Sequence, residues 1–414
     1  MNGNFSVFDQ IRRKKSALFH RGKTAILFFL FVIVCSAAFF TFGGAGGKTV
    51  KSEESGASGK DALNESIYGQ IEALDLEELQ KYADSLNVFD GQSISGRLIA
   101  YIGGESFDYG DFFSQMATLF FKDVQNMLPA FASIAAVALL CGVFAAIRSN
   151  AGGTEHVTFL ITFSAVLLPV LTVVTACFTA AKDAVNSIDT QIQIVFPVLL
   201  TLMSASGQTV SAAIYTPAAA FLSTGAVALI KNVLLPMAIT ITAFSAAGNL
   251  SPSLKLNRFS AFFKSMYKWL TGVCVSVFGL FFTAQGFKGA AYDGIVRRAA
   301  KYAIGTGVPI VGGFLSGGFD LAVAGSALIK NSVGYLGMIL LLAVVFKPLV
   351  MLISANVLLR FTAAVSAPMG ESRISDFLSE TADNVNFCLA GVLMAAFMYF
   401  VTLLLCVCFT EAAF

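Results

Sequence analysis

The chain carries little charge. Only 13% of its 414 residues are Asp, Glu, Lys or Arg, whereas 56% are hydrophobic and the mean hydropathy is +0.76. A soluble domain typically has about 25% charged residues. The composition therefore excludes an ordinary soluble domain. It predicts an all-α, polytopic helical membrane protein, because a helix satisfies its own backbone hydrogen bonds in hydrocarbon.

Residues that usually build catalytic or metal sites are scarce or badly placed. The two histidines, His20 and His156, have no partners at the spacing of metal ligands. The seven cysteines form no Cys-x-x-Cys pair and lie in apolar stretches, as small packing residues do. A serine–histidine pair, a His-Glu-x-x-His helix and a nucleotide-binding motif are also lacking. We therefore expect no enzyme activity, no metal, no cofactor and no nucleic-acid partner.

The first 47 residues combine a basic segment, an apolar core and a run of small residues. Six bases precede the apolar residues 25–42, and glycines and one alanine follow at residues 43–47. This pattern describes either a cleaved signal peptide or a retained signal anchor. Both alternatives place residue 1 in the cytoplasm and residue 48 outside it, by the positive-inside rule.

Residues 48–124 are predicted to form an acidic extracytoplasmic helical region. Residues 48–123 contain 14 acids and 6 bases. The spacing of apolar residues predicts an amphipathic helix over 61–86. Two shorter helical patterns follow within 93–123, broken at Gly103-Gly104 and at Gly110. The acidic faces are either simply solvated or dock a partner protein.

Residues 125–414 are predicted to form a polytopic domain with about seven to nine spans. The apolar stretches are 126–147, 157–181, 192–206, 209–230, 233–248, 269–286, 303–328, 333–359 and 385–410. Several are shorter than the roughly 20 residues that a crossing helix needs. Because prolines also interrupt these stretches, we expect broken or re-entrant helices among them.

Loop charges orient this domain but leave one conflict. The basic loop 249–268 is predicted to be cytoplasmic and the acidic loop 360–384 extracytoplasmic. The basic loop 287–302 lies only one short span away from loop 249–268. Either span 269–286 does not cross, or loop 287–302 is outside for a reason such as partner binding. The residues that make it a candidate partner or topology loop are Asp293, Arg297, Arg298 and Lys301.

The pentapeptide Ala-Leu-Ile-Lys-Asn occurs twice, at 228–232 and 327–331. Three predicted spans separate the copies, so they are expected on opposite faces of the membrane, as an inverted internal repeat. Inverted repeats build many secondary transporters. Under the offset of two upstream matches, Gln208 corresponds to Asp320.

Polar residues in this repeat are candidates for transport or gating, because ionisable groups are costly in hydrocarbon. They are Gln208, Asp320, Lys231, Asn232, Lys330 and Asn331. Alternatives remain open: Asp320 could sit at a break near the interface or pair with Lys330 or Lys347. The lysines could snorkel and the asparagines could cap helices. Candidate positions for helix breaks or close packing are Gly207, Pro217, Pro309, Gly313 and Gly317.

Three segments together resemble a known family. The most specific runs from Gln285-Gly-Phe-Lys-Gly-Ala-Ala-Tyr-Asp293 to Arg298-Ala-Ala-Lys301 and on to Pro309-Ile-Val-Gly-Gly313 and Leu328-Ile-Lys-Asn-Ser-Val-Gly334. Val210-Ser-Ala-Ala-Ile-Tyr-Thr-Pro217 lies upstream and Ala367-Pro-Met-Gly370 downstream. With these segments the chain resembles the stage III sporulation protein AE family. A longer basic N-terminus is where it departs from that family.

The resemblance implies a role that composition does not show. It implies a multi-pass protein of the mother-cell membrane around the forespore, with residues 48–124 extracytoplasmic. It also implies partners from the same operon, namely a secretion-type ATPase and ring-forming proteins, in a channel that supports late forespore development. Membrane lipid is a further partner, and self-association is compatible with the sequence. The alternatives are an autonomous transporter of a small solute and a passive scaffold that recruits ring components.

Overall fold

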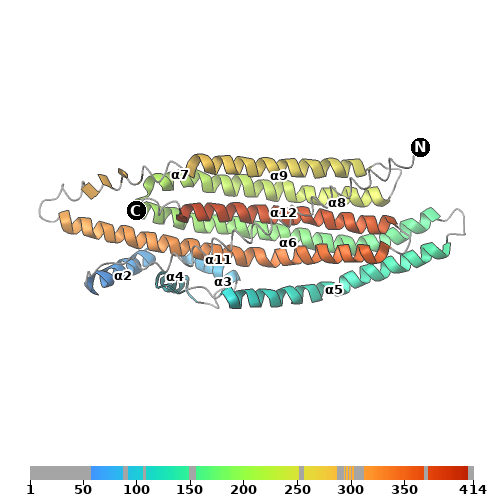
Figure 1. Cartoon of the computed structure of the whole chain (residues 1–414), viewed down its shortest axis with the longest axis horizontal. Coiled ribbons are helices and arrows are strands. Elements are labelled where there is room, and N and C mark those ends of the chain that lie inside the picture. Colours follow the sequence, from blue (N-terminus) through green and yellow to red (C-terminus); the bar gives the residue numbers. More distant parts are fainter. Residues whose placement is uncertain are drawn as a thin grey trace, which may run out of the picture. The chain divides into compact units, whose positions relative to one another are not determined.

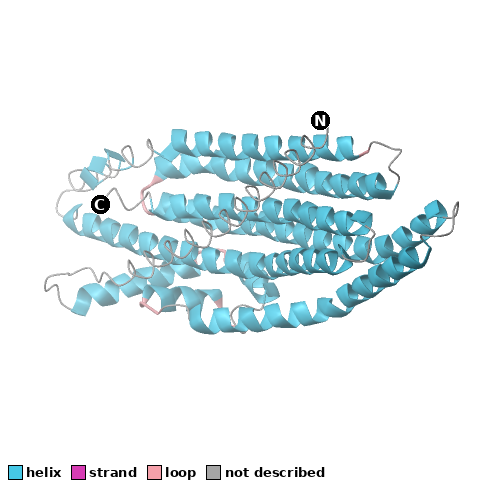
Figure 2. Ribbon diagram, turned by 45° about the vertical axis from the view of Figure 1, so that its right-hand side comes forward, coloured by secondary structure: helices cyan, strands magenta, loops and turns pink. Residues whose placement is uncertain are grey.

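The computed structural model describes residues 57–86, 92–105, 109–148, 155–250, 256–286, 312–367 and 372–408, with single residues between 293 and 302. Within these residues the chain is helical and has no strand (Figure 2), so the predicted all-α class is confirmed. Four described helices are long and apolar enough to cross a membrane, which fits a multi-pass membrane protein. The expected signal peptide or anchor at 1–47 lies outside the described residues.

Three short helices come first. They are α2 (Ala57–Glu72), α3 (Glu77–Leu86) and α4 (Ile94–Ile102). The single helix predicted over 61–86 is therefore two, because Asp75 accepts the backbone N–H of Glu77 at 3.3 Å and restarts the chain as α3. Gly103 and Gly104 end α4 as predicted, and Gly104 has a φ of 91°. The predicted break at Gly110 is wrong, because Gly110 is the second residue of the next helix, which begins at Tyr109.

The long helices form an antiparallel bundle (Figure 1). They are α5 (Tyr109–Arg148), α6 (Glu155–Ala205), α7 (Thr209–Ala220), η1 (Phe221–Val227), η2 (Ile230–Leu234), α8 (Leu235–Leu250), α9 (Asn257–Gly286), α11 (Gly312–Ser366) and α12 (Ser372–Cys408). The elements from α7 to α8 make one continuous helix, in which η1 and η2 are π-helical.

Several predicted spans are joined in the structure. Helix α6 contains both 157–181 and 192–206, the helix from α7 to α8 contains both 209–230 and 233–248, and α11 contains 333–359 and the end of 303–328. The 51 residues of α6 extend about 76 Å at 1.5 Å per residue. A hydrocarbon core is only about 30 Å thick. These helices therefore reach well beyond one bilayer.

The core of the bundle lies around α11 and α12. In the most apolar window of α12 72% of residues are buried, against 28% in α6. Phe163 of α6 contacts Phe377 with ring centres 5.1 Å apart, and Phe196 contacts Tyr399 at 5.9 Å. Because the two contacts follow in the same order along α6 and along α12, these two helices run in the same direction.

The bundle has two ends. The Gly207 end holds Gly207, the start of α7 and the start of α11; the Arg360 end holds the ends of α8 and α11 and the starts of α6, α9 and α12. Helix α11 runs from the Gly207 end to the Arg360 end, because Arg360 pairs with Asp383 near the start of α12. Helix α8 also ends there, since Asn249 donates to Glu380 at 3.1 Å.

This arrangement corrects one prediction and bears on the loop that the charges left in conflict. Segments 249–268 and 360–384, expected on opposite faces, meet at the same end of the bundle. Helix α9 runs the full way to the Gly207 end, where Phe281 contacts Phe221 with ring centres 4.9 Å apart. The described residues of 287–302 therefore lie at the end of the bundle opposite to 249–268. Helix α9 is not one of the four described helices that are long and apolar enough to cross a membrane, so the side of the membrane on which 287–302 lies stays a prediction.

Candidate functional site

The Gly207 end is built on a sharp turn between α6 and α7. Gly207 has a φ of 74°, a left-handed conformation that favours glycine. Its N–H donates to Ser204 O at 3.1 Å, and the Gln208 N–H donates to Met203 O at 2.9 Å. These two bonds complete a Schellman motif, which satisfies the last carbonyls of α6. Gly207 is thus a true helix break, and Gln208 is buried directly before α7.

Asp293 caps the start of α7 from 82 residues away. It is only 2% exposed, and its carboxylate accepts the backbone N–H of Val210 at 2.9 Å and that of Ser211 at 3.1 Å. The Ser211 hydroxyl also donates to it. The first N–H groups of a helix lack intrahelical acceptors and carry a partial positive charge. The carboxylate therefore locks the segment around 293 onto the α6–α7 turn.

A half-exposed ion pair lies at the same end. Lys301 Nζ is 2.6 Å from the Asp320 carboxylate near the start of α11. This is neither the Lys330 nor the Lys347 partner that we considered for Asp320. Arg298 is exposed. The structure thus brings residues of the 287–302 segment together with Asp320 and with the start of α7, which directly follows Gln208.

The remaining predicted positions lie inside helices or outside the described residues. Arg297 and Pro309 are not described, and Gly313 and Gly317 lie in the first turns of α11. Pro217 stays inside a helix, but the α form changes to the π form four residues later at Phe221. The break expected there is a change of helix type. π-Helical turns are rare and often mark functional positions.

The two pentapeptide copies are not equivalent. Lys330 is 1% exposed and close enough to Cys406 to interact electrostatically, so it does not snorkel. Lys231 is half-buried and Asn232 exposed, whereas Asn331 is half-buried. Both copies lie inside long helices, so neither asparagine begins a new span.

The repeat is not inverted. The first copy lies level with Gly391 of α12, because Ile230 is a nearest neighbour of that glycine. The helices that carry the two copies both start at the Gly207 end, and therefore run in the same direction. The inverted relation came from counting predicted spans that are in fact joined.

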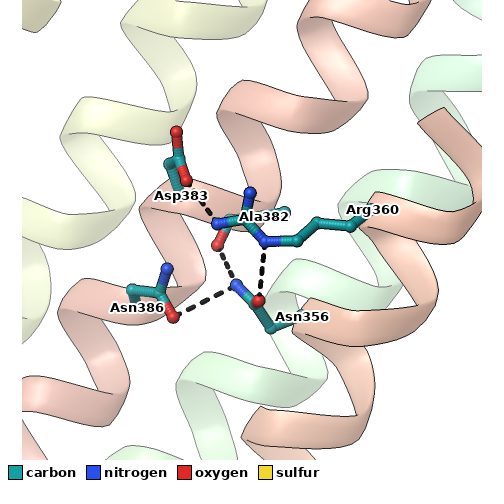
Figure 3. A network of polar contacts seen from close by, with 5 residues as sticks. All are labelled: Asn356, Arg360, Ala382, Asp383 and Asn386. Atoms are coloured by element: carbon teal, nitrogen blue, oxygen red, sulfur yellow. Dashed lines mark hydrogen bonds and ion pairs between the residues drawn. The ribbon is translucent and has the colours of Figure 1, made fainter. Parts of the chain in front are cut away.

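Sequence reasoning missed a polar network between α11 and α12 (Figure 3). Asn356 donates to the Ala382 carbonyl and to Asn386 Oδ1 at 3.1 Å, and accepts from Arg360 Nε at 3.0 Å. Arg360 reaches the Asp383 carboxylate at 2.5 Å. The i, i+4 spacing of Asn356 and Arg360 was a usable signal, but we took Arg360 and Asp383 as loop residues.

A second network joins α12 to α8. Glu380 accepts from the Ser245 hydroxyl and from Asn249 Nδ2 at 3.1 Å. Tyr267 of α9 donates its hydroxyl to the Phe387 carbonyl at 2.7 Å. These bonds satisfy polar groups inside an apolar bundle, where an unmade bond costs about 1–3 kcal/mol. In the part of the chain that the structure describes, no group of three His, Cys, Asp or Glu residues could hold a metal ion.

Most of this chain matches known protein sequences. The sequence model for stage III sporulation protein AE matches residues 95–410, from α4 to the end of α12. The chain is 22% identical over 315 residues to stage III sporulation protein AE of Bacillus subtilis (strain 168), which covers 75% of this chain and 79% of that protein. No solved structure matches the chain. With the turn at Gly207, the Asp293 cap and the whole bundle inside the matched range, the chain belongs to the stage III sporulation protein AE family and has a role in sporulation.

Proposed function

We propose that this protein is the non-enzymatic membrane core of the channel that links mother cell and forespore, in the mother-cell membrane. In this proposal α2–α4 are extracytoplasmic and present a platform to ring-forming proteins, and the secretion-type ATPase works from the cytoplasmic side. Family membership supports a sporulation role. The observation that carries the proposal is the docking of α2–α4 on the bundle.

The platform is attached by specific hydrogen bonds. The Tyr82 hydroxyl of α3 donates to the Ser187 carbonyl of α6 at 2.9 Å. Gln70 of α2 donates to the Ala322 carbonyl of α11 at 3.2 Å and accepts from the Ser326 hydroxyl at 2.7 Å. A platform joined to two bundle helices can transmit a partner's binding to the bundle.

The exposed surface of the platform is acidic. Six acids of α2, α3 and their connection are exposed: Glu65, Glu72, Asp75, Glu77, Glu78 and Asp84. Asp75 and Glu78 also line a groove of about 310 Å³ against α6, whose floor includes Leu74, Leu79 and Val198. An apolar floor with two carboxylates suits the aliphatic stem and cationic head of a partner's lysine or arginine.

Complementation of a spore former that lacks its own copy tests this function. We expect Asp75→Asn with Glu78→Gln to lower late forespore gene expression and the yield of heat-resistant spores. The control, Asp84→Asn with Glu105→Gln, removes the same charge away from the groove and should leave both normal. Normal spores in a strain without the protein would overturn the channel role.

An autonomous solute transporter is the second candidate. The buried Lys330 and the α11–α12 network favour it, because polar groups inside a membrane bundle often line a path. Purified protein that moves a solute across vesicles alone, and loses this on Asp320→Asn, would support transport. Unchanged transport in that variant would remove Asp320 from the mechanism.

A further inference from the structure

Helix α9 has one packed face and one open face. It lies at the edge of the bundle next to α8 (Figure 1) and buries Tyr267 and Phe278. Its opposite face exposes large apolar side chains three and four residues apart: Phe259, Phe262, Met266, Trp269, Val273, Val277 and Leu280. Trp269 is 67% exposed and Leu280 72%. Phe259 at its start contacts Phe244 of α8 with ring centres 5.9 Å apart. The described part of the bundle leaves the rest of the stripe exposed.

The charges of α9 have one sign. Its sequence contains Arg258, Lys264 and Lys268 and no acid. All three bases lie in the first twelve residues of α9, at the Arg360 end. Arg258 is exposed one turn before Phe262 on the open face, whereas Lys264 is half-buried and Lys268 is close enough to Asp383 of α12 to interact with it. Aromatic side chains next to bases are typical of segments at the boundary between headgroups and acyl chains.

The two lysines stand close together. Burial lowers the pKa of Lys268, the neighbouring Lys264 ammonium lowers it further, and Asp383 opposes both. The nearest acid is already engaged, because Asp383 pairs with Arg360 at 2.5 Å. An anion beside Lys264 and Lys268 would relieve their mutual repulsion.

We propose that the first turns of α9 bind the headgroups of anionic phospholipids, with the part of the apolar stripe from Trp269 to Leu280 in the adjoining acyl region. Charge complementarity identifies the occupant: three bases without an acid match an anionic headgroup, and the apolar stripe matches the acyl chains below it. The proposal rests on the membrane location within the proposed function. It adds a lipid preference and places the Arg360 end at the anionic face of the bilayer.

Trp269 reports on this face directly, because it is the sole tryptophan of the chain. The full-length protein is reconstituted in nanodiscs that contain brominated phosphatidylglycerol or, at the same mole fraction, brominated phosphatidylcholine. We expect at least about twofold stronger quenching of Trp269 by the anionic lipid, since Coulomb attraction enriches it near the bases. Lys264→Gln with Lys268→Gln should abolish the difference, and Lys264→Arg with Lys268→Arg should keep it.

The matched control is Lys122→Gln with Lys182→Gln, which removes two exposed lysines of α5 and α6 and should leave the preference intact. Equal quenching by both lipids in the unmodified protein overturns the lipid preference but leaves the membrane location standing. Trp269 shielded from both lipids and from iodide means that protein, such as a second copy, covers the face, which also overturns the proposal. Quenching by iodide alone overturns the membrane location of α9 as well.

Discussion

Replacing Asp293 with alanine should loosen the first turn of α7. The substitution removes the carboxylate that accepts two backbone N–H groups, and leaves the buried Ser211 and the half-buried Val210 without this acceptor. Loss of an N-cap costs about 0.5–2 kcal/mol, and an unsatisfied buried donor costs about 1–3 kcal/mol. We therefore expect about 2 kcal/mol of local destabilisation, or about a 30-fold larger opening constant.

Asp293→Asn should have a smaller effect. The amide keeps one acceptor oxygen but loses the negative charge opposite the positive end of the helix. That charge contributes about 0.3–1 kcal/mol, which corresponds to about a threefold change in the opening constant. The opening constant should therefore be largest in Asp293→Ala, smaller in Asp293→Asn and smallest in the unmodified protein.

Hydrogen–deuterium exchange of the detergent-solubilised protein measures this order, read at the amides of Val210 and Ser211. Asp183→Asn is the control, because Asp183 is exposed on α6 away from the turn. Its exchange at the two amides should match that of the unmodified protein. If Asp293→Ala leaves exchange at Val210 and Ser211 unchanged while the bundle stays folded, the cap does not hold the α6–α7 turn.

Two further pairs of variants test the packing by thermal unfolding. Gly334→Ala puts a methyl group into the Val407 side chain, so it should lower the free energy of unfolding by about 1–3 kcal/mol. At Gly272 an added methyl group meets open space, so Gly272→Ala should raise the free energy of unfolding by about 0.5–1 kcal/mol. Equal effects of the two substitutions would contradict the α11–α12 contact. Lys330→Ala should lower the free energy of unfolding by at least about 2 kcal/mol because a buried side chain is lost. Lys231→Ala should lower it by less than about 1 kcal/mol. A larger effect at Lys231 than at Lys330 would contradict the different burial of the two copies.

Helix class could be predicted from composition, but helix ends could not. One predicted span ends at 181, and Lys182, Asp183 and Asp189 follow it in the sequence. In the structure this polar stretch stays helical, with Lys182 and Asp183 exposed. Two of its other groups have partners on neighbouring helices, because Ser223 donates to Asp189 at 2.5 Å and Tyr82 donates to the Ser187 carbonyl. A polar stretch therefore marks either a loop or a tertiary contact, and only the partner decides which.

Part of the Gly207 end was within reach of the sequence. Gly207 and Asp293 stood out because a glycine breaks a helix and an acid is unusual in a basic loop. The contact between Asp293 and Ser211 joins residues 82 positions apart, and no local pattern encodes that distance. The α11–α12 network was missed for the same reason: Asn356 and Asn386 are polar residues on two helices whose facing sides are set by packing.

The sequence by itself determined that this is an apolar, helical, multi-pass chain of the stage III sporulation protein AE family, because composition and motifs are local properties. Tertiary structure alone decided which spans join, that the two Ala-Leu-Ile-Lys-Asn copies run in parallel, and that Lys330 is buried while Lys231 is not. The physical reason is that burial and direction depend on which helices pack together. Packing brings together the apolar faces of segments that are far apart in the chain, whereas a prediction from loop charges uses only residues that are close together in the sequence.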